Sequence, residues 1–384
     1  MKIVLNAIIT RKNGGGATQI VHNYLSATLK DTNVDWYYII SEELADMIKG
    51  QVKFDPLHWL ILPRQPQIST YFKAKNSIDT FLDSIKPDLI YSILAPSYFT
   101  FKYKEVMRCC NAWDVIDKDD EAFSFIDKKT RIKFGFKTWI VRKLMRRADY
   151  FITQTQVAKD GIIKVTSKDK NSVAVIPNVL PYFYQSKMVE YNHTTSIDIL
   201  YVASPAPHKN IEIVPKVAHI LKYEYGLKNF RFIITIPKNE SRVSLRIRKI
   251  ASTLSVIDEV VNVGSKTQEE LVQLYQSSSL GFFPSVLETF SATLLEYMYF
   301  KLPVVASNKS FNTEVLGDSS IYFETKDARA AADAIYTIIN DEKLRNELLL
   351  RSEQRIKNYM DYGQHYSSTI NFFNQIVEQQ NKIK

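Results

Sequence analysis

The sequence predicts an α/β protein of two doubly wound domains that face each other across a cleft, followed by C-terminal helices. At 384 residues the chain is too long for one ordinary core, so two domains are expected. Apolar runs rich in Ile, Val and Tyr alternate with helical patterns, and this alternation is interrupted at 180–195 and then restarts. Continuous apolar strands between helices are typical of parallel sheets that are covered on both faces.

The predicted strands are short apolar runs separated by helical patterns. In the first domain they lie at 2–9, 35–40, 58–63, 88–93, 105–113, 149–155 and 173–179, with a first helix from Ala17. In the second domain they lie at 198–203, 230–236, 260–264, 280–285, 302–307 and 320–324. The predicted organisation is an N-terminal domain over 1–182, a linker over 183–196 and a C-terminal domain over 197–360. Residues 361–384 are predicted to form a C-terminal helix that packs back on the first domain.

The composition is ordinary for a globular protein, with 45% hydrophobic and 24% charged residues. No apolar run reaches the ~18 residues that indicate a membrane span. The start, MKIVLNAIITRKNGGG, lacks a small-residue cleavage site, so it is interpreted as a strand and not as a signal peptide. Cys109 and Cys110 are adjacent, which is a poor geometry for a disulfide. We therefore expect a cytoplasmic protein.

Most of the net charge of +9 lies in residues 127–147, DKKTRIKFGFKTWIVRKLMRR, which hold nine Lys or Arg against one Asp. A basic amphipathic helix of this kind suits an anionic membrane surface. The alternative is a solvated helix whose apolar side is ordinary core. Nucleic acid is not expected as a partner, because the chain has no RNP, zinc-finger or helix-turn-helix signature. The apolar residues interleaved with the charges are Ile132, Phe134, Phe136, Trp139, Ile140 and Leu144.

Two loops that follow predicted strands hold residues suited to a phosphate. Gly14, Gly15 and Gly16 follow the first strand, where backbone N–H groups and a helix N-terminus can approach a phosphate closely. They do not match the spaced dinucleotide fingerprint, and a plain tight turn is the alternative. In the second domain, ASPAPHKN over 203–210 places Lys209 at the start of a helix. A cation there opposes the helix dipole and favours an anionic partner, the alternative being an ordinary exposed lysine.

The stretch SVLETFSATLLEYM, residues 285–298, holds two glutamates with seven residues between them. Glu288 follows the apolar run LGFFP, at the end of a predicted strand. Ser291 is interpreted as an N-cap, so the N–H groups of the first helical turn are expected to point into the cleft. Glu296 lies beside an apolar helix stripe. A half-buried carboxylate needs hydrogen-bond donors, and the vicinal hydroxyls of a ribose can supply two.

These residues resemble a known family. GSKTQEELVQLYQSSSLGFFPSVLETFSATLLEYMYFKLPVVASNKSFNTEVLGDSSIYFE resembles the donor-binding half of glycosyltransferase family 4, the group 1 glycosyltransferases. The resemblance rests on the spacing of the two glutamates, with FFPS before them, LPVVAS after them and HKN upstream. Two motifs of the first domain support it, GGG and IPNV (176–179). It is specific mainly over 197–325. The family implies the GT-B fold, with two Rossmann-like domains, and retaining, metal-independent transfer from a nucleotide-sugar donor.

The resemblance implies a role for each matching residue. Glu288 corresponds to the glutamate that faces the donor sugar near the reacting centre, and Glu296 to the one that holds the ribose hydroxyls. Lys209 corresponds to the lysine that neutralises the diphosphate. The other donor-binding residues implied are the loop Thr289, Phe290 and Ser291, the glycines Gly15 and Gly16, and Ser265, where the family usually contacts the base.

Two positions depart from the family pattern. The family commonly has an arginine five positions before the lysine, and this chain has Ser204 there. Neutralisation of the diphosphate is then expected to depend more heavily on Lys209, helped by His208. The family also often has a His-Asp pair near the active centre, and here NAWDVID offers Asp114, which we expect near the acceptor hydroxyl.

Asp117 and Asp119 resemble the Asp-x-Asp metal motif of the other glycosyltransferase fold, but a chance match in an acidic loop is the preferred interpretation. We expect no metal and no other cofactor. The predicted function is transfer of a sugar from a nucleotide sugar to a lipid-linked oligosaccharide or glycan in bacterial surface polysaccharide biosynthesis (O-antigen, capsule or exopolysaccharide). The expected location is the inner face of the cell membrane.

Two other functional classes remain open at this point. A dinucleotide-dependent oxidoreductase would need a spaced glycine fingerprint, which the chain lacks. A non-enzymatic basic module that binds membrane or nucleic acid would use residues 127–147 but would leave Lys209, Glu288 and Glu296 without a role.

Overall fold

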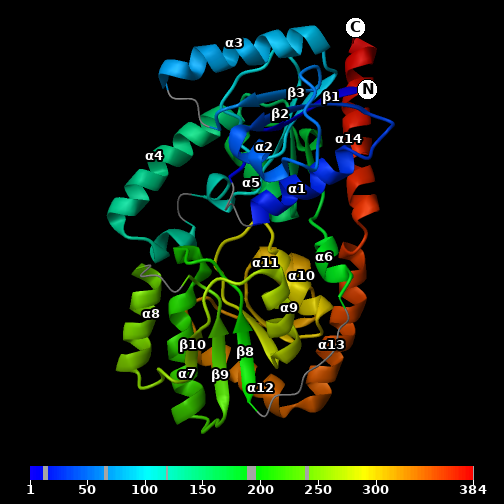
Figure 1. Ribbon diagram of the computed structural model, residues 1–384. Helices are drawn as coiled ribbons and strands as arrows, with labels where there is room; N and C mark the ends of the chain where they lie inside the picture. Colours follow the sequence, from blue (N-terminus) through cyan, green and yellow to red (C-terminus); the bar gives the residue numbers. More distant parts are fainter. Residues whose placement is uncertain (12–15, 65–67, 118–119, 188–195, 238–241, 384) are drawn as a thin grey trace. The chain divides into compact units, whose positions relative to one another are not determined.

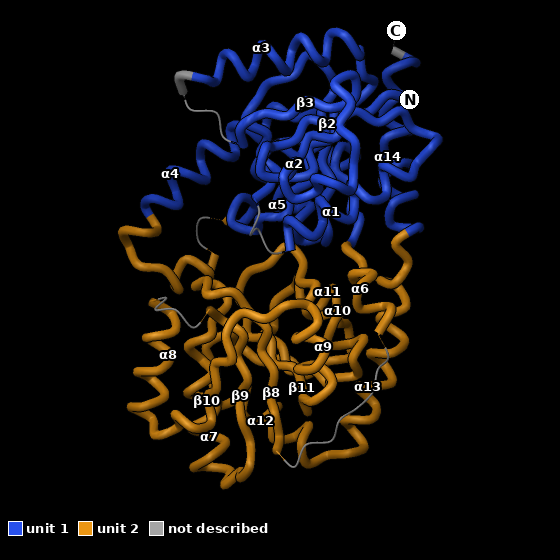
Figure 2. Tube along the Cα trace, viewed as in Figure 1, with its two compact units in different colours: residues 1–116, 132–177, 363–384 blue, residues 117–131, 178–362 orange. Residues whose placement is uncertain are grey.

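The computed structural model describes residues 1–383 except 12–15, 65–67, 118–119, 188–195 and 238–241. The chain divides into two compact units, which Figure 2 shows in different colours. Unit 1 consists of residues 1–116, 132–177 and 363–384, and unit 2 consists of residues 117–131 and 178–362. Each unit is therefore assembled from segments that are not contiguous in sequence.

Unit 1 is built on a seven-stranded parallel sheet with the strand order β3-β2-β1-β4-β5-β6-β7. Figure 1 labels β1, β2 and β3 of this sheet. The strands are β1 (Lys2–Ala7), β2 (Asp35–Ser41), β3 (Trp59–Leu62), β4 (Leu89–Ser92), β5 (Glu105–Arg108), β6 (Tyr150–Thr153) and β7 (Val173–Val175). The helices are α1 (Gly16–Thr28), α2 (Glu42–Ile48), α3 (Ile68–Ile85), α4 (Lys128–Met145), α5 (Gln156–Thr166) and α14 (Tyr362–Ile383). The first residues of α4 and of α14 belong to unit 2.

The sheet of unit 1 is buried on both faces. Successive residues of a strand point to opposite faces, so neighbours in β1 report on both sides. Ile3 lies in a core cluster with Phe373 of α14, whereas Val4 lies in a separate cluster with Ile78 of α3. A strand that is covered on both faces has no need of polar alternation, which explains the continuous apolar run in the sequence.

Unit 2 is built on a six-stranded parallel sheet with the order β10-β9-β8-β11-β12-β13. The strands are β8 (Ile197–Tyr201), β9 (Phe230–Ile234), β10 (Val260–Asn262), β11 (Leu280–Phe283), β12 (Val304–Ser307) and β13 (Ser320–Phe323). The helices are α6 (Tyr182–Gln185), α7 (Val214–Tyr223), α8 (Arg242–Thr253), α9 (Gln268–Ser277), α10 (Ala292–Tyr299), α11 (Ser310–Leu316), α12 (Ala328–Asn340) and α13 (Glu342–Ile356).

Each apolar run that was predicted to be a strand overlaps one, but most strands are shorter than the runs. The clearest correction concerns β5, which was expected to reach Trp113 and ends at Arg108. A 3₁₀ turn, η1 (Ala112–Asp114), follows it. Cys109 and Trp113 are buried although they lie beyond the strand. Hydrophobicity therefore continues into the loops at the carboxyl edge of the sheet and does not mark where hydrogen bonding stops.

The strand order of each sheet reverses once, between β1 and β4 in unit 1 and between β8 and β11 in unit 2. In open α/β sheets, ligands bind outside the carboxyl ends of the strands at such a switch point. The loops that follow β8 and β11 carry Lys209 and Glu288. The topology of unit 2 therefore brings together two residues that are far apart in sequence.

The helix α10 is fixed to the sheet of unit 2 beside this switch point by Tyr297. The Tyr297 hydroxyl donates to the Leu200 carbonyl oxygen at 2.8 Å and accepts from the Val202 N–H group at 3.2 Å. Its ring lies against Gly281 of β11, where a Cβ atom would come within 2.7 Å of the ring. Glycine at this position therefore allows α10 to lie close to β11.

Residues 117–131, which follow the first part of unit 1 in the chain, pack on unit 2. The carboxylate of Glu121 lies 2.5 Å from the Lys309 ammonium and accepts from the Thr325 hydroxyl at 2.5 Å. The Lys326 ammonium lies 5.5 Å from the centre of the Phe125 ring. These contacts attach the 117–131 segment at the carboxyl ends of β12 and β13.

The C-terminal helix α14 is attached to unit 1 through a buried polar cluster. The Tyr24 hydroxyl lies 2.9 Å from Nε2 of His365 and 2.8 Å from the Thr369 hydroxyl. The guanidinium of Arg108, which is fully buried, lies 5.7 Å from the centre of the Tyr24 ring. Burial, reinforced by Arg108, lowers the pKa of His365 to about 3, so its imidazole is uncharged at neutral pH.

Candidate functional site

The loop after β8 is held in place on both sides of Lys209. The hydroxyl of Tyr201 donates to the Lys209 carbonyl oxygen at 2.5 Å. Asn210 has a left-handed backbone conformation with φ of 51°. Its side-chain amide donates to the carbonyl oxygens of Thr325, at 2.7 Å, and Pro284, at 3.3 Å. The loop is therefore fixed to the carboxyl ends of β8, β11 and β13.

Lys209 does not begin an α-helix, which corrects the sequence prediction. It ends a 3₁₀ turn, η4 (Pro207–Lys209), and a second turn, η5 (Ile211–Ile213), precedes α7. The left-handed conformation of Asn210 interrupts the helical pattern between the two turns. The argument from a helix dipole therefore does not apply to Lys209, and its charge is balanced by a carboxylate instead.

Lys209 and Glu288 form an ion pair at the switch point of unit 2. The Lys209 ammonium bonds to Oε1 of Glu288, and the two side chains are 14% and 15% exposed. The Ser285 hydroxyl, 2.9 Å away, donates to the same carboxylate oxygen. Charged groups that are fixed by hydrogen bonds and shielded from water act more strongly on a reacting group than they would in water.

His208 lies beside this pair and is uncharged at neutral pH. Burial lowers its pKa to about 4, an effect that the Glu288 carboxylate opposes and the Lys209 ammonium reinforces. The N–H group of Val286 donates to the His208 carbonyl oxygen at 2.8 Å, which ties the β8 and β11 loops together. His208 therefore carries a positive charge only in acid and does not add to the charge of Lys209 at neutral pH.

Glu296 is buried to a greater extent than expected, at 7% exposed. It lies in the second turn of α10, and its Oε2 accepts from the Tyr275 hydroxyl. Burial raises the pKa of Glu296 to about 7, and the bond from Tyr275 opposes this rise. Ser291 is the N-cap of α10, as predicted, although its side chain makes no capping hydrogen bond.

The other predicted donor-binding residues differ in exposure. Thr289 and Phe290 are buried between Glu288 and α10, whereas Ser204 and Ser265 are exposed in the loops after β8 and β10. In unit 1, Gly16 is the exposed first residue of α1. The predictions for Gly14 and Gly15 lie outside the described residues.

Asp114, the predicted acceptor-side residue, is buried in unit 1. The side-chain amide of Asn111 donates to its carboxylate at 2.8 Å, and Arg142 donates to its carbonyl oxygen at 2.9 Å. Burial raises the pKa of Asp114 to about 6, opposed by Asn111, Lys137 and Arg142. A carboxyl group with a pKa near neutrality can exchange a proton with a neighbouring hydroxyl.

No group of three or more His, Cys, Asp or Glu side chains that could hold a metal ion occurs in the part of the chain that the structure describes. Of the predicted Asp-x-Asp pair, Asp117 is described and Asp119 is not. Among the described residues, no helix is both long enough and apolar enough to cross a membrane.

The helix α4 carries an apolar stripe on its solvent side. Ile132, Phe136, Trp139 and Ile140 are 75%, 66%, 59% and 39% exposed. Their spacing places them on one face of the helix. The alternative that the apolar side of this helix is ordinary core is therefore wrong for these four residues. The buried residues of α4 are Thr138, Val141 and Met145.

Sequence reasoning missed Tyr275, Ser285 and Asn210, which hold the predicted charged residues in place. Ser285 and Asn210 lie within the FFPS and HKN motifs, and their proximity to the glutamate and the lysine was the available signal. Tyr275 had no comparable signal, because it meets Glu296 only through the packing of α9 on α10.

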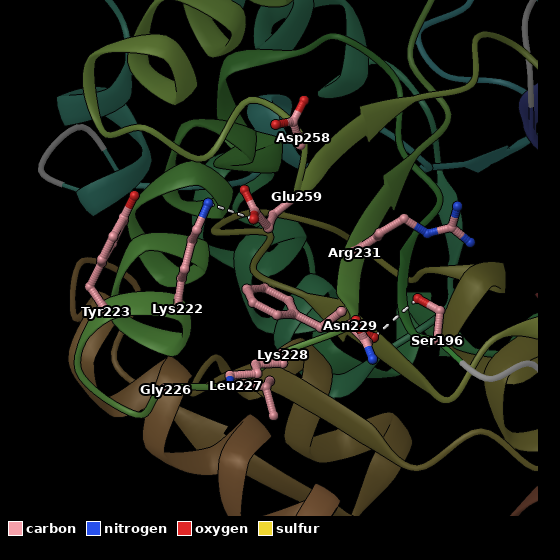
Figure 3. Close-up of a pocket in the computed structure, with 11 residues that line it drawn as sticks. Ser196, Lys222, Tyr223, Gly226, Leu227, Lys228, Asn229, Arg231, Asp258 and Glu259 are labelled. Atoms are coloured by element: carbon pink, nitrogen blue, oxygen red, sulfur yellow. Dashed lines mark hydrogen bonds and ion pairs between the residues drawn. The ribbon is translucent and has the colours of Figure 1, made fainter.

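A hollow of about 990 Å³ lies at the opposite, amino-terminal edge of the sheet of unit 2 (Figure 3). Ser196, Asn229 and Glu259, among its lining residues, directly precede β8, β9 and β10. The ammonium of Lys222 is ion-paired with Glu259 at 2.7 Å. None of the predicted site residues lies in this hollow.

Comparisons with known proteins agree with the fold. Residues 185–355 match the model of a family described as Glycosyl transferases group 1. The O-antigen chain mannosyltransferase RfbU of Salmonella typhimurium is 27% identical over 217 residues, which cover 56% of this chain and 56% of that protein. The alignment thus spans little more than half of this curated relative.

Two solved structures share the fold over nearly the whole chain. A glycosyltransferase from Rickettsia africae ESF-5 has a TM-score of 0.71 at 13% identity, with 98% of each chain covered. Anabaena Alr3699/HepE, in complex with UDP-glucose, has a TM-score of 0.68 at 14% identity, with 100% of each chain covered. The resemblance predicted from the sequence is thereby confirmed: the chain has the GT-B fold, and its residues 185–355 match the family model of the group 1 glycosyl transferases.

Proposed function

We propose that this protein is a retaining, metal-independent glycosyltransferase. It would move a sugar from a nucleotide sugar to a lipid-linked oligosaccharide or glycan in bacterial surface polysaccharide biosynthesis. The observation that carries the proposal is the Lys209–Glu288 ion pair at the switch point of unit 2, with Glu296 on the next helix. All three residues lie in the stretch that matches the family. The UDP-glucose bound to HepE, a protein of the same fold, supports a nucleotide sugar as the donor.

The leaving group sets the first electrostatic requirement. As the bond between the anomeric carbon and the β-phosphate oxygen breaks, negative charge develops on the nucleoside diphosphate. Lys209 would neutralise this charge, and the amide N–H groups at the start of α10 would add the partial positive charge of a helix N-terminus. The ammonium of Lys209 is already bonded to Glu288. A bound diphosphate would therefore become its second anionic partner.

The sugar and the acceptor set the second requirement. The anomeric carbon becomes oxocarbenium-like, and the fixed carboxylate of Glu288 would stabilise its positive charge. The acceptor oxygen would attack on the face from which the diphosphate leaves, forming the new glycosidic bond and passing its proton to the departing phosphate oxygen. Asp114 is proposed to bind the acceptor hydroxyl, a role compatible with its buried carboxyl group.

The protein is proposed to bind its acceptor at the membrane surface. The stripe of Ile132, Phe136, Trp139 and Ile140 on α4 is exposed and lies in the most basic segment of the chain. Apolar side chains that enter the headgroup region beside Lys and Arg are the signature of a helix that binds an anionic membrane surface. A peripheral position on the inner face of the cell membrane follows from this proposal. The similarity to RfbU, an O-antigen chain mannosyltransferase, supports a surface-glycan acceptor.

A donor screen tests the proposal. The purified full-length chain is mixed with UDP-, GDP-, dTDP-, ADP- and CMP-sugars, and the melting temperature is measured with EDTA present throughout. A ligand that binds only the folded state raises the apparent stability by about 2.7 kcal/mol at a hundredfold excess over its Kd. The donor so identified is then incubated with lipid extracts from bacteria, and the anomeric configuration of the product is determined by NMR.

The expected results are a shift with one class of donor and a product of the same anomeric configuration as that donor. Binding of none of these sugars would contradict the proposed activity. An inverted product would contradict the retaining mechanism. Loss of activity in EDTA that Mn²⁺ restores would return Asp117 and Asp119 to consideration as metal ligands.

A further inference from the structure

A hydrogen bond between two buried side chains links α9 to α10 in unit 2. The hydroxyl of Tyr275 in α9 donates to Oε2 of Glu296 in α10. Tyr275 is fully buried, and its ring packs against Tyr184, Tyr297 and Phe300, with ring centres 6.0, 5.9 and 5.0 Å away. A ring that is held on three sides has one position for its hydroxyl. The bond therefore fixes one oxygen of the carboxylate in space.

The start of α9 is fixed as well. Thr267 and Glu270 form a capping box, in which the Glu270 carboxylate accepts from the Thr267 N–H group at 2.8 Å and the Thr267 hydroxyl accepts from the Glu270 N–H group at 3.3 Å. This helix begins directly after the loop of Ser265, where the nucleotide base is expected to bind. The same rigid helix thus follows the expected base loop and carries the hydroxyl that holds Glu296.

The groups around Glu296 are mostly neutral. Tyr184, Tyr275 and Tyr297 lie close enough to feel the charge of its carboxylate, and Glu269 acts in the same way on Tyr184. No described cation is paired with it in an ion pair. A carboxylate in such surroundings is costly to ionise unless a donor compensates it. The Tyr275 hydroxyl is such a donor, and it acts from the side of Oε2.

We propose that Tyr275 is a positioning residue for the nucleotide: its hydroxyl holds the Glu296 carboxylate so that the other oxygen accepts a hydrogen bond from the donor's ribose. The proposal rests on the function proposed above, in which Glu296 binds the ribose. Tyr275 itself does not touch the ligand. Its effect reaches the ribose only through Glu296, so removal of the hydroxyl should weaken recognition of the ribose and leave recognition of the diphosphate intact.

The test compares a ribonucleotide with its 2′-deoxy form. The probes are UDP and 2′-deoxy-UDP, or the corresponding pair for whichever base the donor screen identifies, and their Kd values are measured by calorimetry. The proteins are wild type, Tyr275→Phe, Glu296→Gln and the control Tyr297→Phe. Tyr297 is a buried tyrosine of the same cluster whose hydroxyl bonds to the β8 backbone at Leu200 and to Val202 just beyond it.

Wild type should bind the ribonucleotide about tenfold more tightly than the deoxy form, because a hydrogen bond to a charged group is lost with the 2′-hydroxyl. Tyr275→Phe should reduce this ratio to less than about threefold. Tyr297→Phe can lower the melting temperature but should keep the wild-type ratio. A merely structural role of Tyr275 would weaken both ligands equally and leave the ratio unchanged.

The pH dependence provides a second measurement of the same role. Ribose recognition needs an ionised carboxylate, and Tyr275 favours ionisation of Glu296. The preference for the ribonucleotide should therefore appear only at a higher pH in Tyr275→Phe than in wild type. The ratio of the two Kd values is compared at each pH, because titration of the diphosphate affects both ligands equally and cancels in that ratio.

The outcomes separate the two proposals. If Glu296→Gln loses the ribose preference and Tyr275→Phe keeps it at every pH, the role of Tyr275 is overturned and that of Glu296 stands. If Glu296→Gln also keeps the preference, the assignment of Glu296 fails and the role of Tyr275 fails with it. If no nucleoside diphosphate binds the wild type, the proposed function itself is overturned.

Discussion

The ammonium of Lys209 is bonded to the carboxylate of Glu288, and the two side chains are only 14% and 15% exposed. Each residue is therefore the main compensation for the other's buried charge. Removal of one partner of such a pair leaves an uncompensated charge, which is more costly than loss of the pair as a whole. Single substitutions here should affect stability as well as activity, and the two effects need separate measurement.

Lys209→Met should lower kcat/KM by about a hundredfold or more, because the charge that develops on the diphosphate loses its cation. It should also lower the free energy of unfolding by about 2–4 kcal/mol, because Glu288 is left buried without a counter-charge. Steady-state kinetics and calorimetry measure the two effects. Lys216→Met, at an exposed position on α7, is the matched control and should change neither. Wild-type kinetics in Lys209→Met would exclude the proposed role.

Glu288→Gln should lower kcat by about a hundredfold while the bare nucleoside diphosphate still binds. The amide keeps the size of the side chain but cannot stabilise the positive charge of the sugar. Turnover is measured with the natural donor, and Kd with the nucleoside diphosphate. Glu342→Gln, at an exposed position in the first turn of α13, serves as the control. Transfer at the wild-type rate by Glu288→Gln would show that the assignment is wrong.

The apolar stripe and the basic residues of α4 should contribute separately to membrane binding. Phe136→Ser with Trp139→Ser should weaken sedimentation with anionic vesicles at every salt concentration. A second variant changes four basic residues to Glu: Lys128, Lys129, Arg131 and Lys133. It should weaken sedimentation with anionic vesicles mostly at low salt, because each surface cation contributes about 1 kcal/mol to binding and salt screens this attraction. Donor binding should be unchanged, because the changed residues lie outside the loops after β8 and β11 that carry Lys209 and Glu288.

The matched control for α4 is Leu350→Ser, because Leu350 is an exposed apolar residue on α13, outside the basic segment. Neutral vesicles provide the second control. If the α4 variants and wild type sediment equally with anionic vesicles, α4 has no part in membrane binding, and its exposed stripe needs another explanation.

His365 should make the stability of unit 1 sensitive to acid. Its pKa is lowered to about 3 by burial and by Arg108, whereas an unfolded histidine titrates near 6.5. The unfolded chain therefore binds more protons in this window, and the contribution of His365 to stability is lost as the pH falls from 6.5 toward 3. Between pH 6.5 and 4.5 the loss should be about 2–3 kcal/mol.

Calorimetry of wild type and His365→Gln from pH 7.5 to 4.5 measures this effect. The variant should be less stable at pH 7.5, because packing against Tyr24 is altered, and the difference should shrink as the pH falls. The pKa of His208 is also lowered, so its protonation reduces the stability of both proteins as the pH falls. This effect cancels in the difference between their stabilities. Parallel curves for the two proteins would show that His365 does not titrate as described.

Glu121 and Lys309 should be coupled energetically across the 117–131 segment. Their side chains are partly exposed, so a double-mutant cycle with Glu121→Gln and Lys309→Met should give a coupling of about 0.5–1 kcal/mol. Trypsin should also cut faster at Lys128 and Lys129 in Glu121→Gln, because the segment that precedes them is held less firmly. Additive stabilities with unchanged cleavage would show that the ion pair does not hold this segment.

The fold was predictable from the sequence because strands such as β1 and β11 are buried on both faces and leave continuous apolar runs. Glu288 and Glu296 could be picked out because seven residues separate them after the FFPS motif, and Lys209 because it lies within the HKN motif. Tyr275 was not, since a buried tyrosine in a helix looks like any other core residue. Its proposed function depends on the packing of α9 against α10, and no pattern in the sequence near Tyr275 indicates which helix lies against it.

The same limit applies to α4 and to residues 117–131. An apolar helix stripe that faces a core and one that faces solvent have the same spacing of apolar residues in the sequence. The exposure of Phe136 and Trp139 could therefore not be predicted. Glu121 lies 188 residues before its partner Lys309, and no local pattern links them. Whether a segment packs on the unit that precedes it or on the one that follows depends on such long-range contacts.

The discontinuity of the two units restricts how this protein can be recombined with its relatives. A chimera that exchanges residues 178–362 to change donor specificity would still carry the recipient's own 117–131, and Lys309 and Thr325 would meet a segment that did not evolve with them. A chain truncated after residue 177 would lack α14, and the Tyr24 side of unit 1 would be left without its cover. Exchange of donor modules should therefore succeed only when the crossover points lie at 117, 131, 178 and 362.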